Sequence, residues 1–212
     1  MKCVILELLS VATFVLTLAA LSGHSAQRQV LQQRHWEETE KETIWRDRYT
    51  NCDYGYYVVL PLHVIAHGSH SPNPNHGFLI SLPDVAKTSA ASVNEQRFLW
   101  VNAEYNSSES HSLRGVGDYQ FSLASRDKAD VQVLERKSTT LGGLAAIMFE
   151  FKYGSANSHA TEEEVIALRS GVVYEIGLRT RQADYDRDNQ SFEQIQSGFK
   201  LLSLPQGECR ND

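Results

Sequence analysis

The stretch Leu141–Leu202 decides the fold and reads LGGLAAIMFEFKYGSANSHATEEEVIALRSGVVYEIGLRTRQADYDRDNQSFEQIQSGFKLL. Residues 146–153 form an apolar and aromatic run in which Glu150 and Lys152 alternate with Phe149, Phe151 and Tyr153. This alternation is the two-residue period of a half-buried strand. The alternation returns over 164–169 and over 172–179, and Ser170-Gly171 joins these runs as a short hairpin turn would. The stretch therefore predicts three successive strands.

The end of the same stretch predicts a helix. Four apolar residues follow one another at intervals of three, four and three positions: Phe192, Ile195, Phe199 and Leu202. This spacing places them on one helical face that packs on a core. Asp184, Asp186 or Asp188 can cap the start of the helix.

The upstream sequence adds further elements. Four runs have strand character, and one has weak helical character: Tyr54–Ile65, Phe78–Leu82, Arg97–Tyr105 and Val131–Arg136 as strands, and Tyr119–Ala129 as a helix. From Tyr54 to Leu202 the chain predicts an α+β fold, an antiparallel sheet with packed helices.

The order of these pieces resembles the C-terminal part of the PsbP-like family, which includes the photosystem II extrinsic subunit and many secreted bacterial proteins. The matching positions are Leu141-Gly142-Gly143-Leu144-Ala145, Tyr153, Gly171-Val172-Val173-Tyr174, Tyr185 and the Phe192-x-x-Ile195-x-x-x-Phe199 helix. The resemblance covers residues 141–202 and implies an α/β/α layered domain. Members of this family are mostly assembly or stabilising factors, so it also implies a non-catalytic accessory role.

The N-terminus has the pattern of a secretory signal peptide over residues 1–26. Lys2 precedes an apolar run, and small residues and a polar segment follow it. The alternative is a membrane anchor, but the run of about 14 residues is shorter than the roughly 20 that a spanning helix needs. We therefore expect an exported protein, periplasmic or extracellular, with no stable membrane span after cleavage.

The remaining chain divides into three parts. We expect a polar N-terminal lead with a short helix over 27–52, a single domain over 53–205 and a tail over 206–212. Cys52 and Cys209 lie at the two ends of the domain, and an even pair in an exported chain predicts one disulfide. Two free thiols or a bridge between chains are the alternatives.

The length, hydrophobic content and net charge of the chain bear on its domain count and on its partners. The chain has 212 residues, 42% of them hydrophobic, and a formal net charge of −6. These values are sufficient for one domain with a core, and they argue against a nucleic-acid partner, which would favour a basic face.

Histidines form the most prominent cluster of candidate ligands. Four of the eight histidines lie within one short segment: His63, His67, His70 and His76. Neutral imidazole binds Zn²⁺ or Cu²⁺, so convergence of these side chains would make a metal site. Their spacing matches no recognised zinc motif, and the alternative is a solvated loop.

Two acidic runs have simpler explanations. Asp184-x-Asp186-x-Asp188 resembles the start of a calcium loop, but Asn189 stands where glycine is needed and Ile195 where a bidentate glutamate is needed. Capping of the helix is the alternative. Glu162-Glu163-Glu164 is expected to lie in solvent at a strand start, without a cleft for paired carboxylates.

These observations predict an exported accessory or binding protein without catalysis, whose ligand is a protein partner or another molecule. A secreted Zn²⁺- or Cu²⁺-binding protein that uses the four histidines is the second hypothesis. A hydrolase is the third, although the sequence contains no G-x-S-x-G, S-x-x-K or H-E-x-x-H motif.

Overall fold

The computed structural model describes residues 44–68, 76–82, 97–155, 158–203 and 209. The described elements are, in chain order, β1 (Ile44–Trp45), β2 (Arg48–Asn51), β3 (Tyr56–Val59), β4 (Ala66–Gly68), β5 (Gly77–Ser81), β6 (Phe98–Tyr105), α2 (Leu113–Ser125), β7 (Gln132–Leu141), β8 (Leu144–Ser155), β9 (Ser158–Arg169), β10 (Val172–Arg181), a 3₁₀ turn (Gln182–Asp184), α3 (Tyr185–Gly198) and β11 (Phe199–Leu201).

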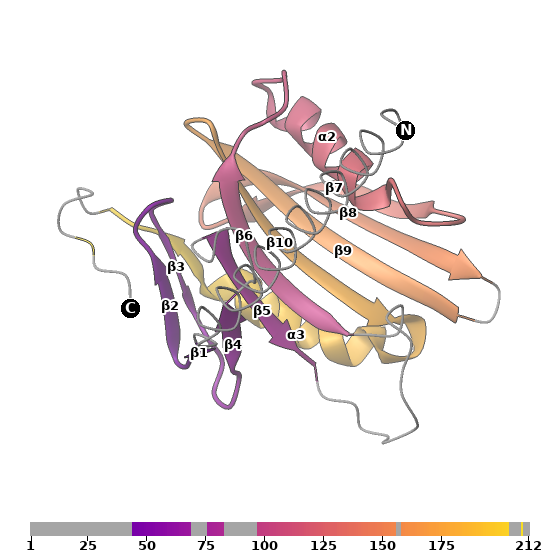
Figure 1. The fold of residues 1–212 in the computed structure, drawn as a ribbon, viewed down its shortest axis with the longest axis horizontal. Coiled ribbons are helices and arrows are strands. Elements are labelled where there is room, and N and C mark those ends of the chain that lie inside the picture. Colours follow the sequence, from indigo (N-terminus) through magenta and orange to yellow (C-terminus); the bar gives the residue numbers. More distant parts are fainter. Residues whose placement is uncertain (1–43, 69–75, 83–96, 156–157, 204–208, 210–212) are drawn as a thin grey trace, which may run out of the picture. The chain divides into compact units, whose positions relative to one another are not determined.

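Within these residues the strands form two antiparallel sheets (Figure 1). The main sheet has eight strands in the order β1-β4-β5-β6-β10-β9-β8-β7, and the smaller sheet has the order β11-β3-β2. The strands β7 to β10 are consecutive hairpins, so neighbours in sequence are neighbours in the sheet. The predicted antiparallel α+β fold is confirmed.

The two helices cover opposite faces of the main sheet and make an α/β/α arrangement (Figure 1). Side chains alternate along each strand, so β10 directs Ile176 and Leu178 to the α3 side and Val173 to the α2 side. The core on the α3 side includes Phe192 and Ile195 of that helix. A smaller core under α2 includes Val116, Phe149 and Phe151.

The hairpin turns agree with the sequence. Ser170 and Gly171 both have positive φ, 51° and 80°, and they connect β9 to β10 with Arg169 opposite Val172. Positive φ at both central residues is the requirement of a type I′ turn, whose twist matches that of the strands. Gly142 and Gly143, with φ of 58° and 84°, connect β7 to β8 in the same way.

The predicted closing helix is correct in position but ends earlier than its apolar spacing suggested. It ends at Gly198, and Phe199 begins β11, which pairs with β3. A side chain at position 198 would overlap the Val59 carbonyl, so glycine allows β3 to approach the helix end. The Phe199 ring still lies in the core, stacked on Tyr56 with centroids 5.1 Å apart.

The helix α2 also differs from the expectation. We predicted a helix over Tyr119–Ala129, whereas the helix begins at Leu113 and ends at Ser125. Ser112 is its N-cap, and its hydroxyl accepts a hydrogen bond from the Gly115 amide at 3.2 Å. The helix therefore begins directly after a serine cap, six residues before the predicted start.

Part of the predicted N-terminal lead belongs to the sheets. Residues 44–51 form β1 and β2 instead of a helix, and Trp45 packs edge-on against Tyr49 at 4.8 Å between ring centroids. Within the described residues the domain therefore begins before position 53. The signal-peptide segment 1–26 lies outside the described residues.

Cys52 and Cys209 are joined by a disulfide, with their Cα atoms 5.6 Å apart. The bridge closes a loop between positions 157 residues apart in the sequence. It connects the segment after β2 to the segment beyond β11, so it ties together the two ends of the described domain.

We expect the double variant Cys52→Ser, Cys209→Ser to lose about 5 kcal/mol of unfolding free energy, because the long loop no longer restricts the unfolded chain. Urea unfolding of the variant and the wild type measures the difference. Wild type reduced with dithiothreitol is the control and should match the variant. Equal midpoints for oxidised wild type and variant would contradict the prediction.

Candidate functional site

The three consecutive glutamates lie in the interior of the main sheet. Glu162, Glu163 and Glu164 belong to β9, which is paired on both sides with β10 and β8, and all three are buried. The expectation that they lie in solvent at a strand end was wrong. Because β9 is covered on both faces, alternation buries the run whichever way each side chain points.

Glu163 points to the α3 side and has a single clear partner. The Tyr185 hydroxyl donates a hydrogen bond to its Oε2 at 2.8 Å. Burial raises the pKa of Glu163, and this hydrogen bond opposes the increase. The contact attaches the first residue of α3 to the centre of the sheet.

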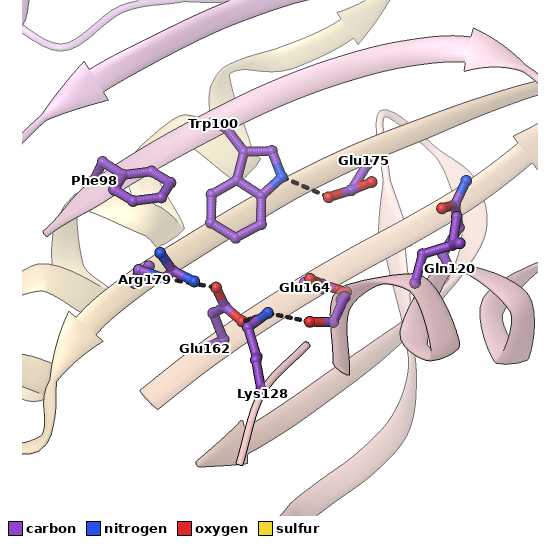
Figure 2. Close-up of a pocket in the computed structure, with 10 residues that line it drawn as sticks. Phe98, Trp100, Gln120, Lys128, Glu162, Glu164, Glu175 and Arg179 are labelled. Atoms are coloured by element: carbon purple, nitrogen blue, oxygen red, sulfur yellow. Dashed lines mark hydrogen bonds and ion pairs between the residues drawn. The ribbon is translucent and has the colours of Figure 1, made fainter. Parts of the chain in front are cut away.

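Glu162 points to the α2 side and is neutralised by two cations (Figure 2). Lys128 Nζ lies 2.5 Å from its Oε2, and Arg179 Nε donates to its Oε1 at 2.9 Å. Lys128 follows α2 in the chain and also donates to the Ala124 carbonyl of that helix. The ion pair therefore connects the end of α2 to β9.

A cavity of about 280 Å³ lies on this face of the sheet, beside α2. We call it the Glu164 cavity, and the residues lining it are Phe98, Trp100, Gln120, Leu123, Ala124, Lys128, Glu162, Glu164, Glu175 and Arg179 (Figure 2). The lining residues come from β6, β9, β10, α2 and the segment that follows α2. The cleft that the sequence did not indicate is therefore present, and carboxylates line it.

Trp100 forms the aromatic wall of the cavity. A side-chain carbon at Gly177 would overlap the indole ring, so glycine at this position of β10 allows the ring to lie against the strand. The indole Nε1 donates to Glu175 Oε1 at 2.5 Å, and the Phe98 ring lies 5.6 Å from the Trp100 ring. These contacts fix the orientation of the indole.

Glu164 has no partner of its own among the described residues. Its exposed fraction is 3%, it lines the cavity, and no hydrogen bond or ion pair within the described ranges reaches its carboxyl group. Burial raises the pKa of Glu164 well above its usual value, and the neighbouring Glu175 and Glu162 raise it further. These surroundings favour the neutral form of the carboxyl group over the charged form.

Glu175, which also lines the cavity, has a raised pKa as well. Burial raises the pKa of Glu175, the Trp100 hydrogen bond opposes the increase, and Glu104 and Glu162 add to it. Glu104 accepts a hydrogen bond from Gln120 Nε2 at 2.7 Å. The site therefore has more carboxyl groups than cations, with both cations on Glu162.

Three of the four candidate metal-binding histidines are among the described residues, and each lies at a different element or turn. His63 lies in the turn between β3 and β4, His67 is in β4, and His76 precedes β5 with its Nε2 3.2 Å from the Tyr54 hydroxyl oxygen. His70 lies outside the described residues. Within the described part of the chain, no three histidine, cysteine, aspartate or glutamate side chains are arranged to hold a metal ion. A Zn²⁺ or Cu²⁺ site using all four histidines stays a prediction.

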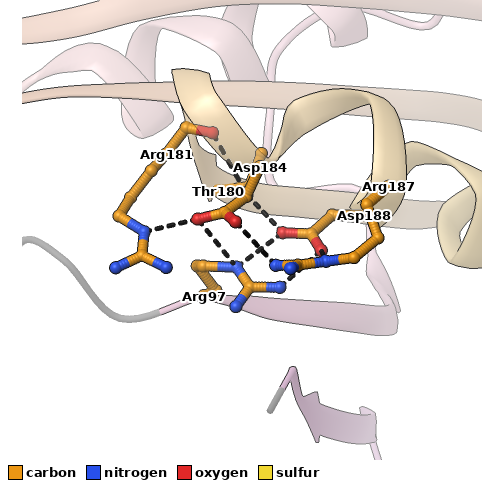
Figure 3. Close-up of polar contacts among 6 residues, drawn as sticks. All are labelled: Arg97, Thr180, Arg181, Asp184, Arg187 and Asp188. Carbon is orange, nitrogen blue, oxygen red and sulfur yellow. Dashed lines mark hydrogen bonds and ion pairs between the residues drawn. The ribbon is translucent and has the colours of Figure 1, made fainter. Parts of the chain in front are cut away.

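Two of the three aspartates of the calcium-like motif, Asp184 and Asp188, bind arginines (Figure 3). Arg97 donates to both carboxylate oxygens of Asp188, at 2.7 and 2.5 Å, and Thr180 also donates to Asp188. Asp184 lies 2.5 Å from Arg181 Nε and 2.7 Å from an Arg187 nitrogen. The carboxylates are therefore occupied by cations of the protein.

The same cluster corrects the capping interpretation. Asp184 occupies the N-cap position of α3, but its side chain makes no capping hydrogen bond. Asp188 is 2% exposed and holds the start of β6, through Arg97, against the first turn of α3. The acidic motif is thus a buried connection between two elements.

We expect Glu164→Gln to stabilise the protein, increasingly so as the pH rises above the usual glutamate pKa of 4.5. A raised native pKa means that Glu164 contributes most to stability below its unfolded pKa, and that this contribution is lost as the pH rises through the native value. The gain should be about 1.4 kcal/mol for each unit by which the pKa is raised. Urea unfolding across a pH series measures it, and a difference independent of pH would contradict the prediction.

We expect Asp188→Asn to lose about 3 kcal/mol of unfolding free energy near neutral pH, because Arg97 would then be buried without its counter-ion. Burial alone would raise the pKa of Asp188, but the Arg97 and Thr180 hydrogen bonds and the Arg97 charge hold it below 3.8. The wild-type advantage should therefore be complete above the usual pKa and should disappear as the pH falls through the lowered value.

Urea unfolding at neutral and acidic pH tests this prediction. The exposed Asp186→Asn, in the same turn of α3, is the matched control and should change stability by about 1 kcal/mol or less. Equal losses in the two variants would show that the buried ion pair is not the cause.

Among the described residues, no helix is long and apolar enough to cross a membrane.

No protein-family model matches the sequence, and no curated protein matches it either. The chain is similar to the solved structure of cyanobacterial PsbP (CyanoP) from Synechocystis sp. PCC 6803, with a TM-score of 0.51 and 16% identity over 77% of this chain and 95% of that one. It is also similar to the Ran-binding protein Mog1p of Saccharomyces cerevisiae, with a TM-score of 0.51 and 7% identity over 76% of this chain and 97% of that one. The chain therefore has a PsbP-like α+β fold.

Proposed function

We propose that the protein is an exported, non-catalytic accessory protein that binds a small molecule in the Glu164 cavity. The observation that carries this proposal is the carboxyl group of Glu164, which is buried against the cavity and has no partner within the described ranges. Nearly all buried polar groups in proteins are hydrogen-bonded, and one left without a partner costs about 1–3 kcal/mol. A ligand in the cavity would supply the missing partner.

The size and lining of the cavity support a small ligand. Its volume of about 280 Å³ is just below the roughly 300–1,000 Å³ of pockets for drug-sized molecules. Apolar side chains, chiefly Trp100, Phe98 and Leu123, share the lining with an amide, three carboxyl groups and two cations. This combination suits a molecule of about one ring with a polar end.

The lining also favours binding over catalysis. None of the described residues that line the cavity is a serine, threonine, cysteine or histidine, the usual nucleophiles and bases of hydrolases. Both oxygens of Glu162 are engaged by Lys128 and Arg179. A hydrolase that uses the raised pKa of Glu164 for acid catalysis is the competing function.

Two features support export. Residues 1–26 have the pattern of a signal peptide. The disulfide between Cys52 and Cys209 suits an oxidising compartment, since such bonds persist mainly outside the cytoplasm. An accessory role agrees with the expectation from the PsbP-like resemblance.

Three probes with one phenylethyl body test the proposed binding: phenethylamine, 2-phenylethanol and phenylacetate. At least one should raise the melting temperature of the wild type in a saturable way and change its tryptophan fluorescence. At a hundredfold excess over Kd the stabilisation would be about 2.7 kcal/mol. Release of product from corresponding esters or glycosides would instead favour the hydrolase.

Variants locate the binding. Trp100→Leu removes the aromatic wall, and Leu123→Arg adds a long cationic side chain at a lining position that is 36% exposed, where we expect little effect on folding. Both should lose binding, whereas Trp45→Phe, on the α3 side of the sheet, should retain it. Absence of binding by all three probes, or equal binding by wild type and Leu123→Arg, would contradict the proposal.

A further inference from the structure

We infer that the ligand of the Glu164 cavity is a small organic cation, an ammonium group on an apolar body, with the ammonium held by Glu164 and Glu175. This inference rests on the proposed function and names the chemical class of its ligand. It is carried by the charges that line the cavity, by the position of the unpartnered carboxyl group and by the aromatic wall beside it.

The charges are unbalanced in favour of acid. Three glutamates line the cavity against two cations, and both cations are engaged by one glutamate, Glu162. Within the described residues neither Glu164 nor Glu175 forms an ion pair, although the Lys128 charge lowers the pKa of both. A cation would restore the balance, whereas an anionic ligand would add a further negative charge to a buried acidic site.

The hydrogen-bonding capacity points the same way. Glu175 uses Oε1 to accept from the Trp100 indole, and within the described part of the chain no second donor reaches that carboxylate. Glu164 accepts from no group there. An ammonium has three N–H donors and no acceptor, so it can donate to both carboxylates at once.

The aromatic wall suits the rest of such a molecule. The Trp100 indole donates a hydrogen bond to Glu175 and packs against the Phe98 ring, and it lies directly over Gly177, which has no side chain. A cation near an indole face gains about 0.5–2 kcal/mol, and an apolar body gains by burial against the ring. Leu123, on α2, adds an apolar surface to the cavity.

Cation binding is coupled to a proton. The charged or titratable groups that face Glu164 are Glu162 on the same strand, Glu175 and Arg179 on β10, Lys128 after α2, Glu104 on β6 and, through Glu162, Tyr153 on β8. Their surplus of acid and their burial raise the pKa of Glu164, so without a ligand the group retains its proton to higher pH. An ammonium favours the ionised carboxylate, so binding releases that proton, and the affinity increases with pH.

Calorimetric titration tests this inference with phenethylamine, 2-phenylethanol and phenylacetate, from about pH 5 to about pH 8, where a buried glutamate can titrate. Phenethylamine should bind about 10- to 100-fold more tightly than the uncharged alcohol, the range expected for a charged hydrogen bond. Phenylacetate should bind more weakly than the alcohol. Titrations in two buffers of different ionisation enthalpy should show release of up to one proton for each amine bound.

The matched pair of variants is Glu164→Gln and Glu163→Gln. The first removes the charge in the cavity and should lose the amine preference and the proton release. The second changes the neighbouring residue, which faces the other side of the sheet and Tyr185, and should retain both. Thermal unfolding of both variants confirms that they are folded.

The outcomes separate the inference from the proposed function. If the alcohol or phenylacetate binds at least as tightly as the amine and Leu123→Arg abolishes that binding, the cavity is a binding site but its ligand is not a cation. If Glu164→Gln binds the amine as wild type does, the assignment to Glu164 is overturned. If none of the three probes binds, both the inference and the proposed function are overturned.

Discussion

The burial of three adjacent glutamates in β9 is the constraint on which the rest of the structure depends. A buried carboxylate is costly unless it is paired or neutral, and β9 contains three in succession. Each one meets this cost differently: Glu162 by two cations, Glu163 by a tyrosine hydroxyl and Glu164 by a raised pKa. The first two solutions determine which neighbouring elements must pack on the strand.

Those partners lie on elements that also contact the sheet through apolar side chains and through further polar contacts, such as that of Gln120 with Glu104. Lys128 connects the end of α2 to one face, and Tyr185 connects the start of α3 to the other. The Arg97–Asp188 pair, bound in bidentate geometry, joins the first turn of α3 to the start of β6. Polar contacts at specific positions therefore supplement the two apolar cores in orienting both helices.

The third glutamate is the one that carries functional meaning. A packed core with an apolar residue at position 164 would avoid the cost, so the buried acid beside a cavity and a fixed indole is the reason we propose a binding site here. The PsbP-like fold is known here through structures of low identity, and a fold alone does not assign a function. The chemistry of the cavity is what supports a binding protein.

Much of the fold follows from local pattern. Alternation over 149–153 and 172–179 predicts strands because the pleat sends successive side chains to opposite faces, and Ser170-Gly171 predicts a turn because its geometry needs positive φ. The same reasoning assigned the wrong element to Phe199, a buried residue whose spacing also fits a helix. Phe199 is buried as predicted, yet it belongs to a strand, since helices and strands both bury aromatic residues.

By itself the sequence determined the antiparallel α+β class, the presence of the closing strands and the turn at Ser170-Gly171, since each depends on neighbouring residues. Only the tertiary structure decided that the glutamate run is interior, because burial depends on α2 and α3 covering both faces of β9. It also decided the cavity, since Trp100, Lys128, Glu164 and Glu175 come from distant segments that strand pairing and helix packing bring together. Glu162, Glu164 and the buried Ile166 are two positions apart along β9, so the sequence could predict that their side chains share a face. It could not predict the partners of these side chains, because it does not specify which cation or ring lies opposite.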